Sequence, residues 1–387
     1  MTSIIGWSHS QFGKLEDQDL EDLIPAAVKA AVEDAGLEFK DIDAIYVGNF
    51  GGFEKQTFPA SFALDADKDL LFKPVTRVEN ACATGTAALN MGAMDIEAKR
   101  SRFVVVVGAE KMTVAPGREI GDILLNASHR KTEGDTAGGF AGVFGNIADL
   151  YFQRYGDQSE AMAAIAAKNH ANGVENPYAQ LRKDFGYEFC NTVSDKNPYV
   201  AGPIRRTDCS LVSDGAAAIV LTDDETAMNF DKAVRFKATA HVQDYLPLNK
   251  RNIIDFDGCS KAWAQAHEKA GTTLEDLSFV ETHDCFTIAE LIQYDAMGLT
   301  EKGQGFRAIK EGWTFKDGKL PINPSGGLKS KGHPIGATGV SMHIMASMQL
   351  LGEAGGMQLD NNPELAGIFN MGGAAVANYV SILERLK

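Results

Sequence analysis

Helix-like and strand-like patterns of apolar residues alternate along this chain, and the alternation predicts a layered α/β architecture. Residues 21–34 and 257–269 have a helix-like pattern, and a glycine follows each stretch, as is common at a helix C-terminus. A short apolar run comes soon after each helix and predicts a strand. Each run ends in a loop, at 48–50 in one case and at 281–283 in the other. The same helix–glycine–strand–loop unit therefore occurs twice.

The two units also resemble each other in sequence. Residues 35–47, AGLEFKDIDAIYV, resemble residues 270–280, AGTTLEDLSFV. Two copies of a long repeat are typical of a duplicated domain rather than of a solenoid. We therefore expect two related halves, 1–225 and 226–387.

Each half continues with a helix rich in small residues and then a buried strand. In the first half, residues 82–99 predict the helix and residues 103–107 predict a strand buried on both faces. In the second half, residues 336–351 predict the helix, and residues 367–370 and 375–383 predict two strands. Strands that alternate with helices indicate a sheet with helices on both faces.

The pattern changes between residues 113 and 205. Charged and aromatic loops surround one long predicted helix, 159–172, and core-like sequence resumes with the apolar run 216–221. We interpret residues 113–205 as a lid that is inserted into the first half.

Composition and charge narrow the possible functions. The formal net charge of −15, with no basic run to offset it, argues against general nucleic-acid binding. No apolar run approaches the ~20 residues of a membrane span, and the N-terminus lacks the pattern of a signal peptide. The five cysteines have no CxxC spacing, so we expect free thiols in the cytoplasm rather than a disulfide framework.

Cys82 is the first candidate for chemistry. It stands at the start of the predicted helix 82–99, where free N–H groups and the helix dipole favour an anion, so we expect a lowered pKa for this thiol. The small residues around it, NACATGTAA over 80–88, let a ligand come close to the backbone. Taken alone, the residue also fits the commonest role of a cysteine, which is packing in a core.

Two distant segments could supply partners for this thiol. His333 lies in the glycine-rich loop Gly332-His333-Pro334, and a neutral histidine can take a proton from a thiol. His283 and Cys285 lie where a predicted strand passes into a helix-like stretch, a common position for ligand sites in α/β proteins. Each of these residues could by itself be a turn or packing residue.

Two further expectations concern Gly372-Gly373 and metals. Gly372-Gly373 follow the predicted strand 367–370 and would offer bare N–H groups to a developing negative charge, although a tight turn explains these glycines equally well. The cysteine and histidine positions lack the spacing of zinc ligands, so we expect no metal site.

Taken together, these segments resemble the thiolase family along essentially the whole chain. The Cys82 segment resembles the family's nucleophile motif, Gly332-His333-Pro334 its Gly-His-Pro motif, and residues 208–218 another familiar stretch. Where most thiolases have Asn-Glu-Ala-Phe, this chain has His283-Asp284-Cys285-Phe286, and where most have Cys-x-Gly it has Asn370-Met371-Gly372. This combination resembles the sterol-carrier-protein-2 type of thiolase and the acetyl-CoA acetyltransferases similar to it.

The resemblance implies an α/β thiolase fold, with two duplicated halves in a five-layer αβαβα arrangement and an inserted loop domain. It also implies a reversible Claisen condensation and thiolysis of 3-oxoacyl-CoA, with acetoacetyl-CoA as the expected substrate. His333 would activate Cys82 for acylation, and Cys285 would move the α-proton. His283 and His333 would stabilise the enolate oxygen, and the N–H groups of Cys82 and Gly372 would hold the other oxyanion.

Coenzyme A is then a substrate, and no metal or redox cofactor is implied. Its phosphates need basic partners, and the candidates are Arg205, Arg206, Lys250 and Arg251. The resemblance further implies a homodimer or homotetramer. Two alternatives stay open, a catalytically silent thiolase-like protein that binds acyl-CoA or scaffolds an assembly, and a condensing subunit that depends on an OB-fold/zinc-ribbon partner.

Overall fold

One nine-stranded sheet runs through the protein. The computed structural model describes residues 1–387 except for the side chain of Arg118. The first half of the sheet contains, in spatial order, β3 (Val75–Val78), β2 (Ala44–Gly48), β4 (Val104–Lys111), β7 (Asp214–Asp223) and β1 (Thr2–His9). The second half continues with β8 (Val234–Gln243), β11 (Ala377–Arg385), β10 (Leu365–Gly372) and β9 (Phe279–Thr282). β1 and β8 join the halves through two residue pairs, Ser3 with Arg235 and Ile4 with Val234.

The strand order confirms the internal repeat. In the first half β2 is parallel to β4, and β4–β7 and β7–β1 are antiparallel. In the second half β9 is parallel to β10, and β10–β11 and β11–β8 are antiparallel. The expected boundary at residues 225 and 226 falls between β7 and β8.

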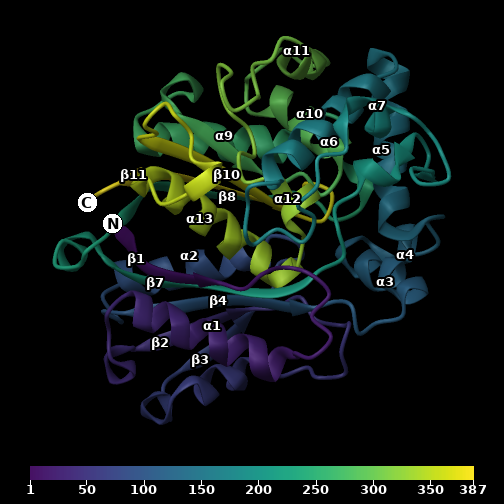
Figure 1. Cartoon of the computed structure of the whole chain (residues 1–387). Coiled ribbons are helices and arrows are strands. Elements are labelled where there is room, and N and C mark those ends of the chain that lie inside the picture. The colour runs from purple at the N-terminus through teal and green to yellow at the C-terminus, as the bar shows by residue number, and fades with distance from the viewer.

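Helices complete the five layers (Figure 1). α1 (Leu20–Asp34) covers the outer face of the first half-sheet, and α9 (Asp257–Ala270) covers that of the second. α2 (Thr84–Glu97) and α13 (Ile335–Leu351) lie between the half-sheets and contact each other, and α13 touches strands of both halves. The core is therefore continuous from one half to the other.

Glycines allow the two central helices to touch. A Cβ on Gly85 of α2 would lie 2.8 Å from the carbonyl oxygen of Gly336, and a Cβ on Gly339 of α13 would lie 2.3 Å from the backbone nitrogen of Thr86. Larger residues at these positions would force the backbones apart. The contact brings the N-terminus of α2, beside Cys82, next to that of α13, beside His333.

The inserted segment forms a helical wall at one side of the sheet (Figure 1). It contains α3 (Gly117–Leu124), α4 (Arg130–Glu133), α5 (Gly139–Tyr155), α6 (Ser159–Gly173), α7 (Gly186–Asn191) and a small hairpin of β5 (Tyr199–Ala201) and β6 (Ile204–Arg205). The remaining α-helices are α8 (Asp224–Ala227), α10 (Thr287–Ala296), α11 (Gly305–Lys310) and α12 (Gly327–Lys331), and short 3₁₀ helices occur in the connecting loops.

The five helices predicted from the sequence are confirmed, with small shifts at their ends. Residues 21–34, 82–99, 159–172, 257–269 and 336–351 correspond to α1, α2, α6, α9 and α13. The shift that matters is at α2, which begins at Thr84, so that Cys82 lies outside the helix.

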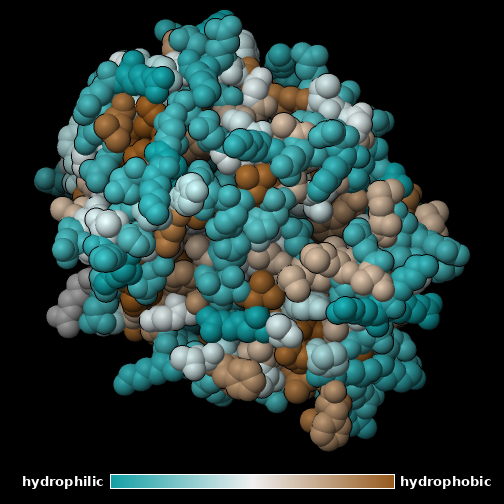
Figure 2. Space-filling model, turned by 180° about the vertical axis from the view of Figure 1, so that it is seen from behind, coloured by the Kyte–Doolittle hydropathy of each residue, from teal (hydrophilic) through white to brown (hydrophobic). Residues whose placement is uncertain are grey.

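Among the described residues, no helix is long and apolar enough to cross a membrane. The face shown in Figure 2 is mainly hydrophilic, with hydrophobic areas set between the polar side chains.

Candidate active site

Cys82 lies in a strained turn between β3 and α2. The preceding residue, Ala81, has a φ of 50°, a left-handed conformation that costs a residue with a side chain about 1–3 kcal/mol and recurs at functional sites. The Thr84 hydroxyl oxygen supports the turn by accepting the backbone N–H of Asn80 at 2.8 Å. The turn therefore places Cys82, which is only 3% exposed, just before the N-terminus of α2.

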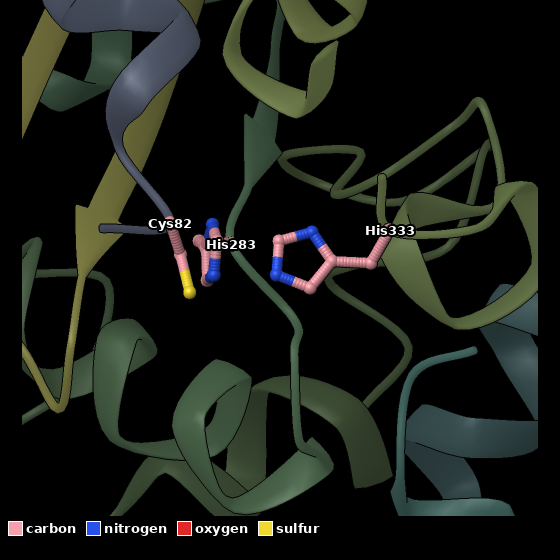
Figure 3. A group of neighbouring side chains, drawn as sticks. All are labelled: Cys82, His283 and His333. Carbon is pink, nitrogen blue, oxygen red and sulfur yellow. The ribbon is translucent and has the colours of Figure 1, made fainter. Parts of the chain in front are cut away.

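The other candidate residues come from two loops of the second half. His283 and Cys285 lie between β9 and α10, and His333 lies between α12 and α13. The Cys82 sulfur and one nitrogen of each imidazole lie within 4.8 Å of one another. In Figure 3, the edge of the His333 ring that lies opposite its Cβ points toward Cys82 and His283. The two rings meet edge to face, with centroids 5.1 Å apart.

Cys82, Cys285 and His333 open into one cavity of about 340 Å³. Its wall is largely apolar and comes from the inserted segment and the residues around it, including Ile120, Leu124, Phe140, Leu211 and Phe286. The inserted segment thus covers the reactive side chains, and an apolar wall suits the acyl part of a ligand.

Hydrogen bonds define the proton position on His333. Its Nδ1 lies 2.7 Å from the Thr338 hydroxyl, and that hydroxyl donates to the carbonyl oxygen of Pro334 at 2.9 Å. Since a hydroxyl has one proton, Thr338 accepts from His333, and Nδ1 carries the hydrogen. Nε2 is therefore unprotonated, and it is the nitrogen on the side of Cys82 (Figure 3). This arrangement makes His333 a general base for the thiol.

Burial keeps this pair uncharged at rest. Desolvation, with a further effect of the Lys331 ammonium, lowers the pKa of His333 to about 3. Desolvation also raises the pKa of Cys82 to about 12, although a hydrogen bond from the Gly373 N–H favours the thiolate. The expectation of a lowered thiol pKa was wrong, because Cys82 precedes the helix and the cost of burying an anion outweighs the effect of the helix terminus. The site therefore holds a thiol beside a neutral base.

Cys285 is the second thiol of the cavity. Desolvation raises its pKa well above the ordinary value, and the neighbouring Cys82 and Asp284 raise it further. A thiol of high pKa gives a strongly basic thiolate, which suits the removal of a proton from a weak carbon acid.

Buried carboxylates anchor the loop and helix that flank His333. Asp284 accepts the backbone N–H groups of Leu328 and Lys329 at 2.6 and 3.1 Å, and so fixes α12. Glu110 accepts the N–H of Gly336 at 3.0 Å, at the start of α13. His333 lies between these two anchors, which limits the movement of its imidazole.

Two glycines bring the end of β10 against the Cys82 turn. A Cβ on Gly372 would lie 2.4 Å from the carbonyl oxygen of Asn80, so this position needs glycine for close packing. The next residue, Gly373, directs its N–H at the Cys82 sulfur. Of the two glycines predicted as N–H donors, Gly373 is the one that reaches the Cys82 sulfur, and the role of Gly372 toward an oxyanion stays a prediction.

Arg205 is not a coenzyme A ligand. Its guanidinium is buried and donates to Asp208, to Asn191 and to the carbonyl oxygen of Ser159. Because these protein groups occupy its donors, the expectation for this residue was wrong. Arg206 and Lys250 are exposed and Arg251 is partly buried, and for these three the role stays a prediction.

Replacing Arg205 by methionine should therefore reduce stability and leave coenzyme A binding unchanged. The change removes the partner of the buried Asp208 carboxylate, and breaking such a pair costs about 3–5 kcal/mol in the free energy of unfolding. Denaturant unfolding measures the loss, and Arg206→Met is the exposed control, which should unfold like the parent protein. A raised KM for coenzyme A with unchanged stability would contradict this assignment.

Two residues to which the sequence analysis gave no role, Thr338 and Asn370, form hydrogen bonds with the candidate site residues. Thr338 sets the tautomer of His333. Asn370 on β10 donates to both the carbonyl oxygen of Cys82 and His283 Nδ1. The sequence had marked Asn370 only as a departure from the Cys-x-Gly segment of most thiolases, and its contacts with Cys82 and His283 come from the fold.

Comparisons with known proteins identify relatives of this chain. Residues 2–186 match the family described as "Thiolase, N-terminal domain", and residues 240–385 match "Thiolase C-terminal domain-like". An acetyl-CoA acetyltransferase from Methanothermobacter thermautotrophicus is 37% identical, over 99% of both chains. Sterol carrier protein 2 from Oryctolagus cuniculus is 31% identical over 96% of this chain and 70% of that protein.

A solved structure titled "Ltp2-ChsH2(DUF35) aldolase" has the same fold, with a TM-score of 0.85 over 100% of this chain and 98% of that one, at 20% sequence identity. Family descriptions that match both halves, and a relative of this similarity along its full length, establish the family. The chain belongs to the thiolase family.

Proposed function

We propose that this protein is an acyl-CoA C-acyltransferase that forms and cleaves 3-oxoacyl-CoA through an acyl group on Cys82. The observation that carries the proposal is the meeting of a thiol, an unprotonated imidazole nitrogen and a second thiol at one apolar cavity. The name of the archaeal relative supports acetyl transfer, so acetoacetyl-CoA is the expected substrate.

The first half-reaction in the condensing direction acylates Cys82. The thiol passes its proton to His333 Nε2 as the sulfur attacks the thioester carbonyl of an acyl-CoA. The carbon–sulfur bond to coenzyme A breaks, and the Cys285 thiol gives its proton to the leaving sulfur. The N–H of Gly373 and that of Cys82 lie beside the reacting sulfur and can stabilise the oxyanion.

The second half-reaction makes the carbon–carbon bond. The Cys285 thiolate takes the α-proton of a second acyl-CoA, and the resulting enolate attacks the acyl carbonyl on Cys82. The Cys82 sulfur leaves and recovers its proton from His333. Each side chain ends in its starting state, and thiolysis is the reverse sequence.

This reaction balances with protein side chains and two thioesters, so we propose coenzyme A as substrate and no resident metal or redox cofactor. We likewise propose a reducing cytoplasm as its location, because the cysteines lack the CxxC spacing and even number of a disulfide framework.

Thiolysis of acetoacetyl-CoA by the purified chain tests the proposal. Acetyl-CoA should form only when free coenzyme A is added, and mass spectrometry of the enzyme with acetyl-CoA alone should find acetyl on Cys82. A catalytically silent acyl-CoA-binding protein would bind the thioester without turnover or acylation, and that result would overturn the proposal.

Dependence on an OB-fold/zinc-ribbon partner is the second candidate. It is supported by the fold shared with a chain whose title names a DUF35 assembly. Full turnover by the purified chain alone would contradict it.

We also propose at least a homodimer through the edge strand β3. An edge strand presents unpaired backbone groups, and α2, which packs on β3, exposes 41% of Met91 and 61% of Met94. Light scattering should give at least twice the chain mass of 41.6 kDa, and Met94→Lys should shift the protein toward a monomer. A parent protein that is monomeric at micromolar concentration would refute this interface.

A further inference from the structure

Asn370 is a buried amide that connects the nucleophile to His283. It lies on β10, and its side chain is fully buried. Its Nδ2 donates to the carbonyl oxygen of Cys82 at 3.1 Å and lies 2.9 Å from His283 Nδ1. Its Oδ1 accepts the Thr86 hydroxyl at 2.8 Å. Every polar atom of the amide therefore has a partner.

These contacts determine the proton position on His283. A carbonyl oxygen can only accept, so the end of Asn370 that faces the Cys82 carbonyl is the amide nitrogen. The same nitrogen faces His283 Nδ1, which must therefore accept. In the neutral imidazole the hydrogen is then on Nε2. Burial keeps the ring neutral, since desolvation lowers its pKa well below the ordinary value.

The Nε2–H of His283 has no protein partner among the described residues, although it is buried. A buried donor without a partner costs about 1–3 kcal/mol. One nitrogen of the His283 ring lies within 4.8 Å of the Cys82 sulfur and of a nitrogen of His333. Since Nδ1 is occupied by Asn370, we infer that an oxygen of a ligand beside Cys82 is the partner of the Nε2–H. An unpaired donor placed before binding is the arrangement that stabilises an oxyanion.

We propose that Asn370 is a positioning residue that fixes His283 as a neutral Nε2–H donor. The two imidazoles then have opposite tautomers, His333 with a lone pair toward the site and His283 with a hydrogen toward it. The histidine at 283 and the asparagine at 370, each a departure from the common thiolase pattern, are on this view one coupled change. The further step, that this Nε2–H binds the enolate oxygen, rests on the proposed function.

Asn370→Asp tests the proposal with little change of shape. The oxygen that replaces Nδ2 can accept a hydrogen from Nδ1 in either protonation state of the carboxyl group. The proton of His283 should then move to Nδ1 and leave a lone pair facing the enolate oxygen. We expect the kcat of condensation to fall about 100-fold, the effect of losing one oxyanion donor. Acylation of Cys82 by acetyl-CoA should fall much less than condensation, because it loses only the Asn370 hydrogen bond to the Cys82 carbonyl oxygen and keeps the Gly373 N–H beside the sulfur.

The tautomer itself is measured by nitrogen NMR of the protein with labelled histidine, using His283→Gln to assign the signal. The parent protein should show a protonated Nε2 and a bare Nδ1 on His283, and Asn370→Asp should show the reverse. Asn197→Asp is the matched control, because Asn197 is also a buried amide that donates to backbone carbonyls, but it lies in the inserted segment away from His283. It should lose stability and keep both tautomer and kcat.

The outcomes separate the proposals. A parent protein with hydrogen on Nδ1 of His283 overturns the inference without any variant. Unchanged condensation in Asn370→Asp, or a loss of acylation equal to that of condensation, overturns it as well. Failure of the parent protein to acylate Cys82 would instead refute the proposed function.

Discussion

Replacing Cys82 by serine should lower the kcat of thiolysis by about 10⁴-fold or more and remove the acyl-enzyme. His333 is a neutral base whose pKa is about 3, so it can assist a thiol but is far too weak for an alcohol. The serine oxygen would also lie in the same strained turn, with no change in the cavity. The measurement is the rate of acetoacetyl-CoA cleavage, together with mass spectrometry of the enzyme after incubation with acetyl-CoA.

Cys259→Ser is the matched control for this variant. Cys259 is equally buried but belongs to α9, on the outer layer of the fold, so the same exchange there should affect stability and leave turnover near the parent value. Turnover by Cys82→Ser within about tenfold of the parent rate would show that the acyl group does not pass through this residue, since a lost nucleophile costs far more.

The internal repeat was predictable because the two copies keep the same local signals. A helix ends at Gly36 and at Gly271, both with positive φ, and each is followed by a buried strand. These features depend on residues close in the sequence. Strand β8 was missed although its buried positions alternate with partly buried or exposed ones, because no strong turn signal precedes it. Helix α5 was missed because it begins with Gly139 and Gly142, which are poor helix formers.

The electrostatics of the site were less predictable than its members. Helix position alone suggested a lowered pKa for Cys82, but the pKa depends on burial, which comes from the inserted segment and from the contact of α2 with α13. In the same way Arg205 looks like a phosphate ligand in the sequence, and only the fold brings Asp208, Asn191 and Ser159 around it. Contacts between residues far apart in the sequence therefore determine both the pKa of Cys82 and the role of Arg205.

Replacing His333 by glutamine should lower kcat about 10³-fold, a typical loss for a general base. Glutamine can reach the Cys82 thiol but cannot take its proton at neutral pH. The pKa of the thiol, about 12, leaves very little thiolate to react unaided. The substitution should therefore slow acylation and condensation together, because the same proton leaves Cys82 in one step and returns in the other.

The pH dependence distinguishes this account from a preformed thiolate–imidazolium pair. With a neutral pair, alkylation of Cys82 by iodoacetamide should rise about tenfold per pH unit from pH 6 to 9. A preformed ion pair would give a rate that levels off in this range. His343→Gln is the control, because His343 is a buried histidine of α13 that bonds Gly339 and Ser381 outside the cavity, and its loss should leave the alkylation rate unchanged. A plateau below pH 7 that disappears in His333→Gln would mean that His333 holds the proton before substrate arrives.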